Sequence, residues 1–295
     1  MKVGFIGLGK MGAGMVRNVA AKFSVTAYDA QSAAVRAAVS AGAMAGESAA
    51  DTASDADVLV TMLPGPREIE AVMLGDGVAS ALKPGAIWVD MSSSSLETLR
   101  RIVSAHPDGG WTVLDAPVTG GVPGAEAGTL QVFAGGSAED FERAAEVLAS
   151  MANPERILHV GEQGAGYAVK LCLNLGFFLH AMAGAEVLAL GVKAGVDLRL
   201  LHDALVGSGA SSAFLENDAA QNVFAGDYKE YFRLALAMKD VRLAVDLGRE
   251  VGVPLELSAI VEQLMCRAYL TYGDGGQLLA VKQLEETAGI ELRRD

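Results

Sequence analysis

The pattern of hydrophobic and polar positions divides the chain into two parts. Up to Gly161, short β-branched or aromatic runs, such as Lys2 to Gly7 and Asp57 to Met62, alternate with stretches of helical periodicity. Beyond Gly161 the strand-like runs stop, and the segments that follow have helical periodicity. Alternating strands and helices are typical of a parallel sheet covered by helices. The pattern therefore predicts an α/β fold, with a doubly wound sheet in residues 1–161 and an all-α domain in residues 162–295.

A long apolar stretch, Gly161 to Lys193, begins the second part and predicts a long interdomain helix. Lys170 and Asn174 are polar exceptions in its first turns, and their spacing of four puts them on one helix face. Burying a lysine and an amide costs free energy unless something uses them. We therefore expect Lys170 and Asn174 to be functional. The alternative is a lysine whose stem lies along apolar surface while its charge reaches water.

The same stretch is long enough to raise the question of a membrane span. Asn174, His180 and Glu186 interrupt it, which favours a buried helix and no membrane. A helix that is apolar nearly all round needs partners on all sides. We therefore expect a homodimer, or a higher homo-oligomer, with this helix near the interface.

A glycine motif follows the first predicted strand and opens a helical stretch. It reads Gly7-Leu8-Gly9-Lys10-Met11-Gly12. In a G-x-G-x-x-G motif the glycines allow a tight turn, close approach of backbone to a pyrophosphate, and close helix–strand packing. The helix N-terminus offers free N–H groups to the phosphates. The motif predicts a Rossmann-type dinucleotide site, and the alternative is a glycine turn with a structural role only.

The next predicted strand, Phe23 to Tyr28, ends in Asp29. An acidic side chain about twenty residues after the glycine motif accepts hydrogen bonds from the adenosine ribose. Its charge repels a 2′-phosphate, and no arginine follows directly. Asp29 therefore favours NAD, with NADP possible. The alternative is that Asp29 caps the helix expected near Ser32.

Further candidates follow later strands of the predicted sheet. Leu63-Pro64 and the serine run from Ser92 to Ser95 come where strands end, which is the edge at which open parallel sheets bind ligands. On spacing alone, the alternative is that the serines form a helix cap. Between these turns, residues 67 to 81 are predicted to be helical.

The segment Asp115 to Gly121 follows another predicted strand. Its glycine pair, Gly120-Gly121, frees backbone N–H groups for an anion, and Thr119 adds a hydroxyl. A plain surface turn is the alternative. The residues that follow, Val122 to Gly128, are expected to form a Gly/Ala loop.

Composition and charge narrow the class of protein. The 295 residues carry a formal charge of −13, which argues against nucleic acid and against an anionic membrane as partners. Two cysteines, Cys172 and Cys266, exclude a disulfide framework and are expected to be buried free thiols, which places the protein in the cytoplasm. The histidines are scattered without metal-ligand spacing, so no metal is expected.

Taken in order, these motifs resemble the β-hydroxyacid dehydrogenase family, which includes 3-hydroxyisobutyrate dehydrogenase and tartronate semialdehyde reductase. The resemblance runs nearly end to end. It rests on the glycine motif with Met15 and Asn18, on Asp115 to Gly121, on Gly164-Ala165-Gly166 with Lys170 and Asn174, and on Lys239-Asp240.

The resemblance implies hydride transfer between NAD(P) and a small, anionic 3-hydroxy acid or its semialdehyde, with Lys170 as general acid/base. It implies that Asn174 positions the hydroxyl and that Lys239, held by Asp240, reaches toward the nicotinamide or the substrate. Further residues are assigned in two sets: the substrate carboxylate to Thr119, Gly120 and Gly121, and cofactor contacts to Leu63, Pro64 and Ser93.

The chain departs from the family pattern at several positions, and two other activities fit the same architecture. Leu173 stands where the family often has a second asparagine, which leaves the identity of the acid open. An NADPH-dependent imine reductase is one alternative, but enzymes of that group generally replace the helix lysine. A nucleotide-sensing protein without turnover is the other, and it would not need Lys170.

Overall fold

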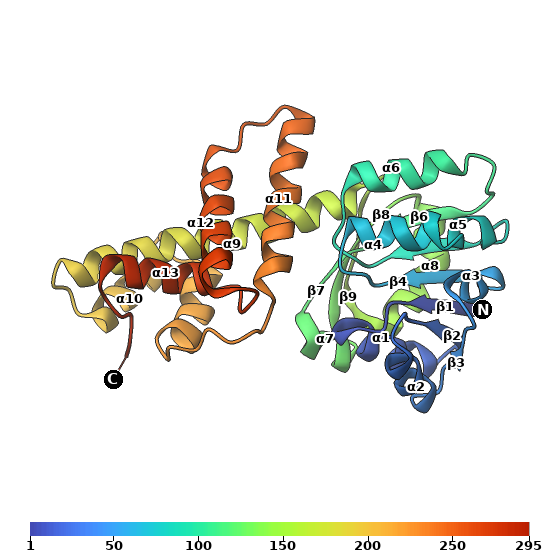
Figure 1. Cartoon of the computed structure of the whole chain (residues 1–295), viewed down its shortest axis with the longest axis horizontal. Coiled ribbons are helices and arrows are strands. Elements are labelled where there is room, and N and C mark those ends of the chain that lie inside the picture. Colours follow the sequence, from blue (N-terminus) through green and yellow to red (C-terminus); the bar gives the residue numbers. More distant parts are fainter. Residues whose placement is uncertain (295) are drawn as a thin grey trace. The chain divides into compact units, whose positions relative to one another are not determined.

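The computed structural model describes residues 1–294 and divides into two compact units, Met1–Lys170 and Leu171–Asp295. The first unit is built on one mixed sheet with helices, and the second is helical (Figure 1). The α/β architecture and the helical second part expected from the hydrophobic pattern are confirmed.

The sheet of the first unit has the strand order β3-β2-β1-β4-β5-β6-β8-β7, with β9 paired to β8. The strands from β3 to β6 are parallel, β8 is antiparallel to β6 and β7, and β9 is parallel to β8. The order reverses next to β1, which is the point where such sheets bind nucleotides. The strands are β1 Lys2–Ile6, β2 Ser24–Tyr28, β3 Met44–Ala45, β4 Val58–Thr61, β5 Ile87–Asp90, β6 Thr112–Asp115, β7 Val118–Thr119, β8 Leu130–Gly135 and β9 Ala152–Gly161.

Helices cover both faces of this sheet. Successive side chains of a strand point to opposite faces, and here both faces are apolar, so each needs a covering layer. In β5, for example, Ile87 and Val89 join one buried cluster while Trp88 joins the other. The first cluster is covered by α1 Lys10–Ala20, α2 Ser32–Ser40, α7 Gly121–Ala127 and α8 Ala138–Met151. The second is covered by α3 Ala49–Ser54, α4 Pro66–Glu70, α5 Val78–Ala81 and α6 Leu96–Ala105.

Two predictions for this unit need correction. Residues 67 to 81 are not one helix: a π-helical turn, η1 (Ala71–Gly75), follows α4, and Gly77 has φ +72° before α5 starts. The expected loop from Val122 to Gly128 is wrong, because this segment is helix α7. Its proline, Pro123, lies in the first helical turn, where the missing N–H would have no intrahelical partner in any case.

Helix α9, Ala165–Lys193, starts in the first unit and continues through the second. With 29 residues it is about 43 Å long at 1.5 Å per residue. By length and composition alone it would be long and apolar enough to cross a membrane. Its side chains, including Leu171, Phe178 and Leu188, instead lie in the buried cluster of the second unit, so α9 is a core helix.

The other helices of the second unit pack around α9 through the same buried cluster. Leu215, Val241 and Met265, each from a different helix, are almost fully buried there. The helices are α10 Leu198–Val206, the π-helix η2 Phe214–Val223, α11 Leu234–Val251, α12 Glu256–Tyr272 and α13 Leu279–Ala288.

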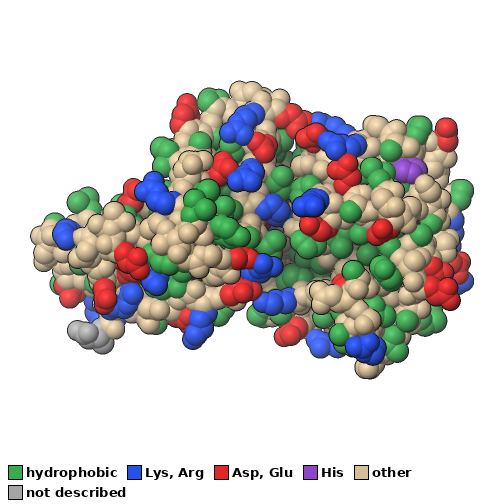
Figure 2. All heavy atoms as spheres, in the orientation of Figure 1, with side chains coloured by type: hydrophobic (Ala, Val, Ile, Leu, Met, Phe, Trp, Pro, Cys, Tyr) green, Lys and Arg blue, Asp and Glu red, His purple; other side chains and the backbone are tan. Residues whose placement is uncertain are grey.

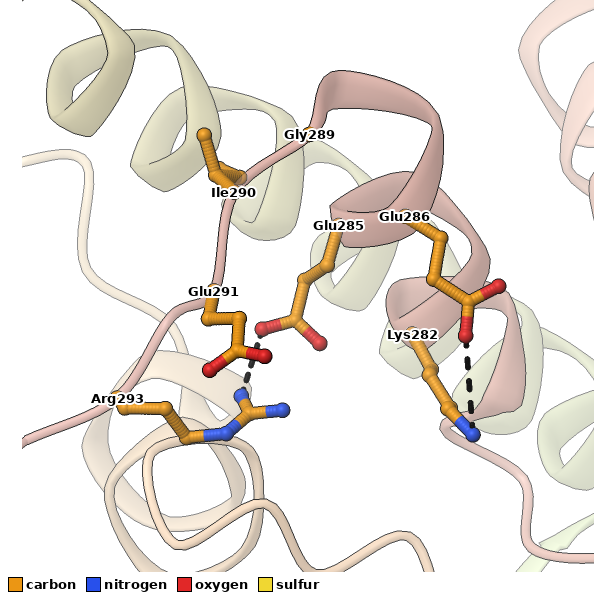
Figure 3. A pocket seen from close by; sticks show the side chains of 7 residues that line it. All are labelled: Lys282, Glu285, Glu286, Gly289, Ile290, Glu291 and Arg293. Atoms are coloured by element: carbon orange, nitrogen blue, oxygen red, sulfur yellow. Dashed lines mark hydrogen bonds and ion pairs between the residues drawn. The ribbon is translucent and has the colours of Figure 1, made fainter.

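The chain end is bound to this unit through Glu285, which is 3% exposed. Its carboxylate accepts hydrogen bonds from Leu292 N and Arg293 Nη1, both at 2.7 Å, and from the Tyr228 hydroxyl. Beside these bonds lies a cavity of about 450 Å³, into which Lys282, Glu286 and Glu291 also project (Figure 3). Glu285 is paired with Arg293 and Lys282 with Glu286, and the bonds of Glu285 hold the C-terminal segment in place.

The expectation that both cysteines are buried is wrong. Both are free thiols, but Cys172 is exposed and Cys266 is partly exposed. On α9, Leu171 faces the core and the next two residues, Cys172 and Leu173, face outward. Across the surface, acidic and basic side chains are interspersed with hydrophobic ones on the face that Figure 2 presents.

Candidate active site

The glycine motif forms the turn from β1 into α1, and each glycine has a distinct steric role. Gly7 has φ +98°, and a Cβ there would lie 2.3 Å from Met62 O. A Cβ on Gly12 would lie 1.9 Å from Gly7 O, so α1 packs directly on the turn. A Cβ on Gly9 would meet nothing within 4 Å, which leaves open space beside the backbone. The loop therefore fits a dinucleotide: two glycines build the turn and the third leaves room for a phosphate group.

The other residues of the motif complete this turn. Leu8 is buried in the core, and Met11 packs partly against it. Lys10 is the first residue of α1 and is exposed. The open space, the helix N-terminus and an exposed lysine thus share one end of α1.

Asp29, directly after β2, is bonded to the glycine loop. Its Oδ2 accepts a hydrogen bond from Leu8 N at 2.7 Å, and its Oδ1 accepts one from Gln31 N at 2.8 Å. Helix α2 begins at Ser32 with Gln31 at its N-cap position and no side-chain cap. A carboxylate has about four acceptor positions, so two remain for ribose hydroxyls.

The turns after β4 and β5 are connected through Asp90, which is fully buried. Asp90 Oδ1 accepts hydrogen bonds from Thr61 Oγ1 at 2.7 Å and from Ser92 Oγ at 2.6 Å. Ser92 Oγ in turn accepts a hydrogen bond from Leu63 N at 2.9 Å. These bonds hold together the two turns that carry the predicted cofactor contacts Leu63, Pro64 and Ser93. Burial raises the pKa of the Asp90 carboxyl. The hydrogen bond from the Ser92 hydroxyl acts in the opposite direction and lowers this pKa.

The start of α9 is attached to the same strand edge. Tyr167, 1% exposed, donates its hydroxyl to Asp90 Oδ2, and its backbone N donates to Asp115 Oδ2 at 2.8 Å. Gly164 N donates to Asp115 Oδ1 at 2.6 Å. Burial raises the pKa of Asp115 to about 7 and that of Tyr167 well above its usual value. A Cβ on Gly166 would lie 2.2 Å from Asp115 O, so glycine is required where α9 meets β6.

Thr119 ends β7, and the glycine pair leads into α7. Gly120 has φ +127° and Gly121 has φ +61°, a backbone conformation that favours glycine. The other end of α7 is bonded to α1: Asn18 Nδ2 donates to Ala125 O at 2.8 Å. A Cβ on Gly14 would lie 2.8 Å from Ala125 C, so the two helices are in close contact.

Lys170 lies on α9, three residues after Tyr167, and is 9% exposed. It belongs to the first unit, whereas Asn174, one turn further along α9, belongs to the second. In the second unit, Asn174 Nδ2 donates to Asp240 Oδ2 at 2.6 Å, and Lys239 Nζ lies 3.1 Å from Asp240 Oδ1. Asp240, 1% exposed, thus contacts both polar residues that the resemblance assigns to the helical part, Asn174 by a hydrogen bond and Lys239 by an ion pair.

The residues missed at the sequence level are Asp90 and Tyr167, and Asp115 was named only as part of a motif. The available signal was an aspartate as the last residue of a buried apolar strand, which occurs in both β5 and β6. Parallel neighbours end at one edge, and Asp90 pairs in register with Asp115. A second cavity, of about 280 Å³, lies beside α6 and is lined in part by Gln163 and Gly164, which precede α9. Among residues 1–294 no group of His, Cys, Asp or Glu side chains is arranged to hold a metal ion.

Two family models match the chain. The NAD binding domain of 6-phosphogluconate dehydrogenase matches residues 2–161, and the NAD-binding domain of NADP-dependent 3-hydroxyisobutyrate dehydrogenase matches residues 164–283. Together they cover the glycine loop, the buried carboxylates, α9 and most of the helical unit.

Characterised relatives match along nearly the whole chain. The chain is 36% identical to 2-(hydroxymethyl)glutarate dehydrogenase of Eubacterium barkeri, covering 99% of this chain and 94% of that protein. It is 35% identical to 3-hydroxyisobutyrate dehydrogenase of Pseudomonas aeruginosa, covering 89% and 90%. The structure of Mycobacterium tuberculosis 3-hydroxyisobutyrate dehydrogenase with L-serine superposes with a TM-score of 0.89 at 30% identity, covering 96% and 98%.

Imine reductases are more distant. The enzyme from Streptomyces aurantiacus superposes with a TM-score of 0.59 at 21% identity, a likeness of fold alone. The glycine loop, the family models and the long, well-covered matches to dehydrogenases agree with one another. The chain therefore belongs to the β-hydroxyacid dehydrogenase family and is an NAD(P)-dependent oxidoreductase.

Proposed function

We propose that the substrate is a small 3-hydroxy carboxylic acid or its semialdehyde and that Lys170 is the general acid/base. The observation that carries this assignment is the position of Lys170. It is a nearly buried lysine on the first turns of α9, directly after a segment bonded to the nucleotide-binding edge of the sheet. The relatives named for 2-(hydroxymethyl)glutarate and 3-hydroxyisobutyrate support the substrate class.

The remaining site residues bind or position the substrate and the cofactor in this proposal. Thr119, Gly120 and Gly121 bind the substrate carboxylate, which the left-handed backbone at both glycines supports because it exposes N–H groups. Asn174 positions the hydroxyl, and Lys239 contacts the nicotinamide or the substrate. Their bonds to Asp240 support these two roles, since a fixed amide and a fixed ammonium lose less freedom on binding.

The chemistry needs one proton transfer between the substrate and the protein. The nicotinamide, when bound, supplies the acceptor or donor of the hydride. Lys170 Nζ takes the proton from the substrate hydroxyl as the carbon–hydrogen bond breaks, and an aldehyde forms. In the reverse direction Lys170 returns this proton to the new alkoxide oxygen. Positioned acid–base catalysis of this kind contributes about 10²- to 10⁴-fold to a rate.

NAD is the cofactor we favour over NADP. The bound geometry of Asp29 supports this choice, because its carboxylate is anchored by two backbone N–H groups beside the glycine loop. A fixed negative charge there repels a 2′-phosphate and accepts hydrogen bonds from a 2′-hydroxyl.

The two parts of the chain divide the work. Residues 1–161 bind the dinucleotide and contribute the carboxylate contacts at Thr119 to Gly121. Residues 162–295 supply the other substrate contacts and the dimer interface. Large apolar side chains that remain exposed on α9 support a homodimer, with Leu190 at 72% and Val187 at 44% exposure. The free thiols of Cys172 and Cys266 support a soluble, cytoplasmic protein. Sedimentation velocity tests the assembly.

The experiment that tests the function is a cofactor absorbance assay. It pairs NAD(H) and NADP(H) in turn with 3-hydroxyisobutyrate, glycerate, serine, 3-hydroxypropionate and tartronate semialdehyde. We expect turnover with at least one of these compounds, stronger with NAD. In Lys170→Ala, kcat should fall by about 10²- to 10⁴-fold while the Kd for NAD is unchanged.

Lys193→Ala is the matched control, because Lys193 ends the same helix, is exposed, and donates a hydrogen bond to Ala288 O. It should retain wild-type kcat. Near-normal turnover of Lys170→Ala would remove the acid/base assignment. Tight NAD binding without turnover of any hydroxy acid would support the nucleotide-sensing alternative, and a strong preference for NADP would contradict the role of Asp29.

A further inference from the structure

The proposed reaction does not use the side chain of Tyr167, which is buried in the first unit. Its ring is in the core between the sheet and the helices α3 to α6, where a phenylalanine would pack equally well. Its hydroxyl nevertheless has a specific partner, the Asp90 carboxylate. Burying a hydroxyl and a carboxylate is unfavourable unless both are hydrogen-bonded, so this bond needs an explanation beyond packing.

Tyr167 joins α9 to two neighbouring strands at once. The side-chain hydroxyl binds Asp90 at the end of β5, and the backbone N binds Asp115 at the end of β6. With Gly166 pressed against Asp115 O, the first turn of α9 has little freedom to shift or rotate.

Asp90 also contacts the turns to which cofactor contacts are assigned. Its other oxygen binds Ser92 Oγ, and that atom accepts the hydrogen bond from Leu63 N. One buried carboxylate therefore connects the first turn of α9 with the two turns to which cofactor contacts are assigned.

Lys170 is three residues after Tyr167 on an uninterrupted helix. This spacing places the two residues on adjacent turns, about 4.5 Å apart along the axis and on the same side of the helix. A displacement of the Tyr167 turn thus moves Lys170 with it.

We propose that Tyr167 is a positioning residue for the reaction: its hydroxyl, bound to Asp90, sets the position of Lys170 relative to the turns at Leu63 and Ser92. This proposal rests on the proposed role of Lys170. It predicts that losing one hydroxyl at Tyr167 affects turnover more than losing an equivalent hydroxyl on the strand side of the same carboxylate.

The chain offers that matched pair. Tyr167→Phe removes a donor to Asp90 that belongs to α9, and Thr61→Val removes a donor to Asp90 that belongs to β4. Both variants keep the approximate shape of the side chain and leave the same buried carboxylate with one donor fewer. Thr61→Val also removes the acceptor of Trp88 Nε1, so its loss of thermal stability should be at least as large as that of Tyr167→Phe.

Three readouts separate positioning from stability. In Tyr167→Phe we expect kcat to fall by about 10- to 100-fold with the Kd for NAD nearly unchanged, because a misplacement of about 1 Å has effects of this size. Backbone amide exchange in residues 162–172, measured without cofactor, should become faster. The pH profile of kcat should shift as well. In Thr61→Val, kcat should stay within about threefold and exchange in residues 162–172 should be unchanged.

Equal losses of kcat in both variants, or unchanged amide exchange at the start of α9 in Tyr167→Phe, would overturn the proposal. If Tyr167→Phe does not fold, Asp90→Asn provides the second test, since an amide oxygen still accepts the tyrosine hydroxyl. It should then show faster exchange in residues 162–172 and a lower kcat than the wild type, and wild-type values of both would count against the proposal. Absence of turnover in the wild type concerns the proposed function, while the exchange comparison still tests the positioning.

Discussion

The two stretches of α9 are held in place by different kinds of interaction. The first, Ala165 to Lys170, is fixed by hydrogen bonds to Asp90 and Asp115 and by backbone contact at Gly166. The second, from Leu171 on, is held by large apolar side chains such as Phe178 and Leu188 in the core of the helical unit.

This difference indicates what each stretch is required to do. Hydrogen bonds and backbone contact specify a position to a fraction of an ångström, whereas an apolar core tolerates changes of shape at constant volume. The stretch with directional contacts carries Lys170, and the stretch held by apolar burial provides the framework of the second unit. Three substitutions test this difference between the two stretches of α9.

The largest effect is expected for Asp115→Asn, as a function of pH. Burial raises the pKa of Asp115 to about 7, so between about pH 4 and pH 7 the folded chain holds a proton that the unfolded chain has lost. The stability that Asp115 contributes is therefore greatest at low pH and is lost as the pH rises through 7. Asparagine does not titrate, so the variant should not show this loss. Its free energy of unfolding, relative to that of the wild type, should rise by up to about 4 kcal/mol between pH 4 and pH 8.

Thermal and denaturant unfolding from pH 4 to pH 8 measure this difference. Asp197→Asn is the control, because Asp197 also accepts a hydrogen bond from a helix N-terminus, that of α10, but is exposed. Parallel pH dependences of wild type and Asp115→Asn would show that the buried carboxyl does not titrate in this range.

The second effect in size is expected for Gly166→Ala. The added methyl group would lie 2.2 Å from Asp115 O and 2.4 Å from Phe133 O, both backbone atoms of the sheet. Neither can move without disturbing a strand, so we expect a loss of about 3 kcal/mol, which corresponds to a fall in Tm of roughly 10 °C. Scanning calorimetry measures it. A Tm within about 2 °C of the wild type would mean that the start of α9 adjusts freely.

The smallest effect is expected for Leu188→Met, in the second stretch. Leu188 is fully buried, and methionine has a similar volume and adapts to the space available. We expect a loss below about 1.5 kcal/mol and an unchanged kcat. A larger loss than that of Gly166→Ala, measured in the same calorimetric series, would reverse the comparison between the two stretches.

Local sequence patterns predicted the parts of the fold that are determined by residues close together in the sequence. The glycine loop follows from the spacing of Gly7, Gly9 and Gly12, and the structure gives each the steric role that the motif requires. Helix α7 was missed because glycine and proline are read as helix breakers, although Pro123 occupies a turn that tolerates it.

The contacts that organise the candidate site could not be found in this way. The bond between Tyr167 and Asp90 joins residues 77 positions apart, and nothing next to either residue reveals the other. The exposure of Cys172 was missed for a related reason. Helix α9 is apolar on all sides, so its sequence does not indicate that Leu171 faces the core and Cys172 faces outward.

The bonds of Asp29 have a consequence for redesign of cofactor preference. The usual route to an NADP-dependent enzyme removes the acidic residue that repels the 2′-phosphate. Here the same carboxylate accepts hydrogen bonds from Leu8 N in the glycine loop and from Gln31 N at the start of α2, so its removal also leaves both of these N–H groups without their acceptor. Asparagine keeps one acceptor oxygen, and alanine keeps none. A successful cofactor exchange in this enzyme therefore has to rebuild the loop as well as the charge.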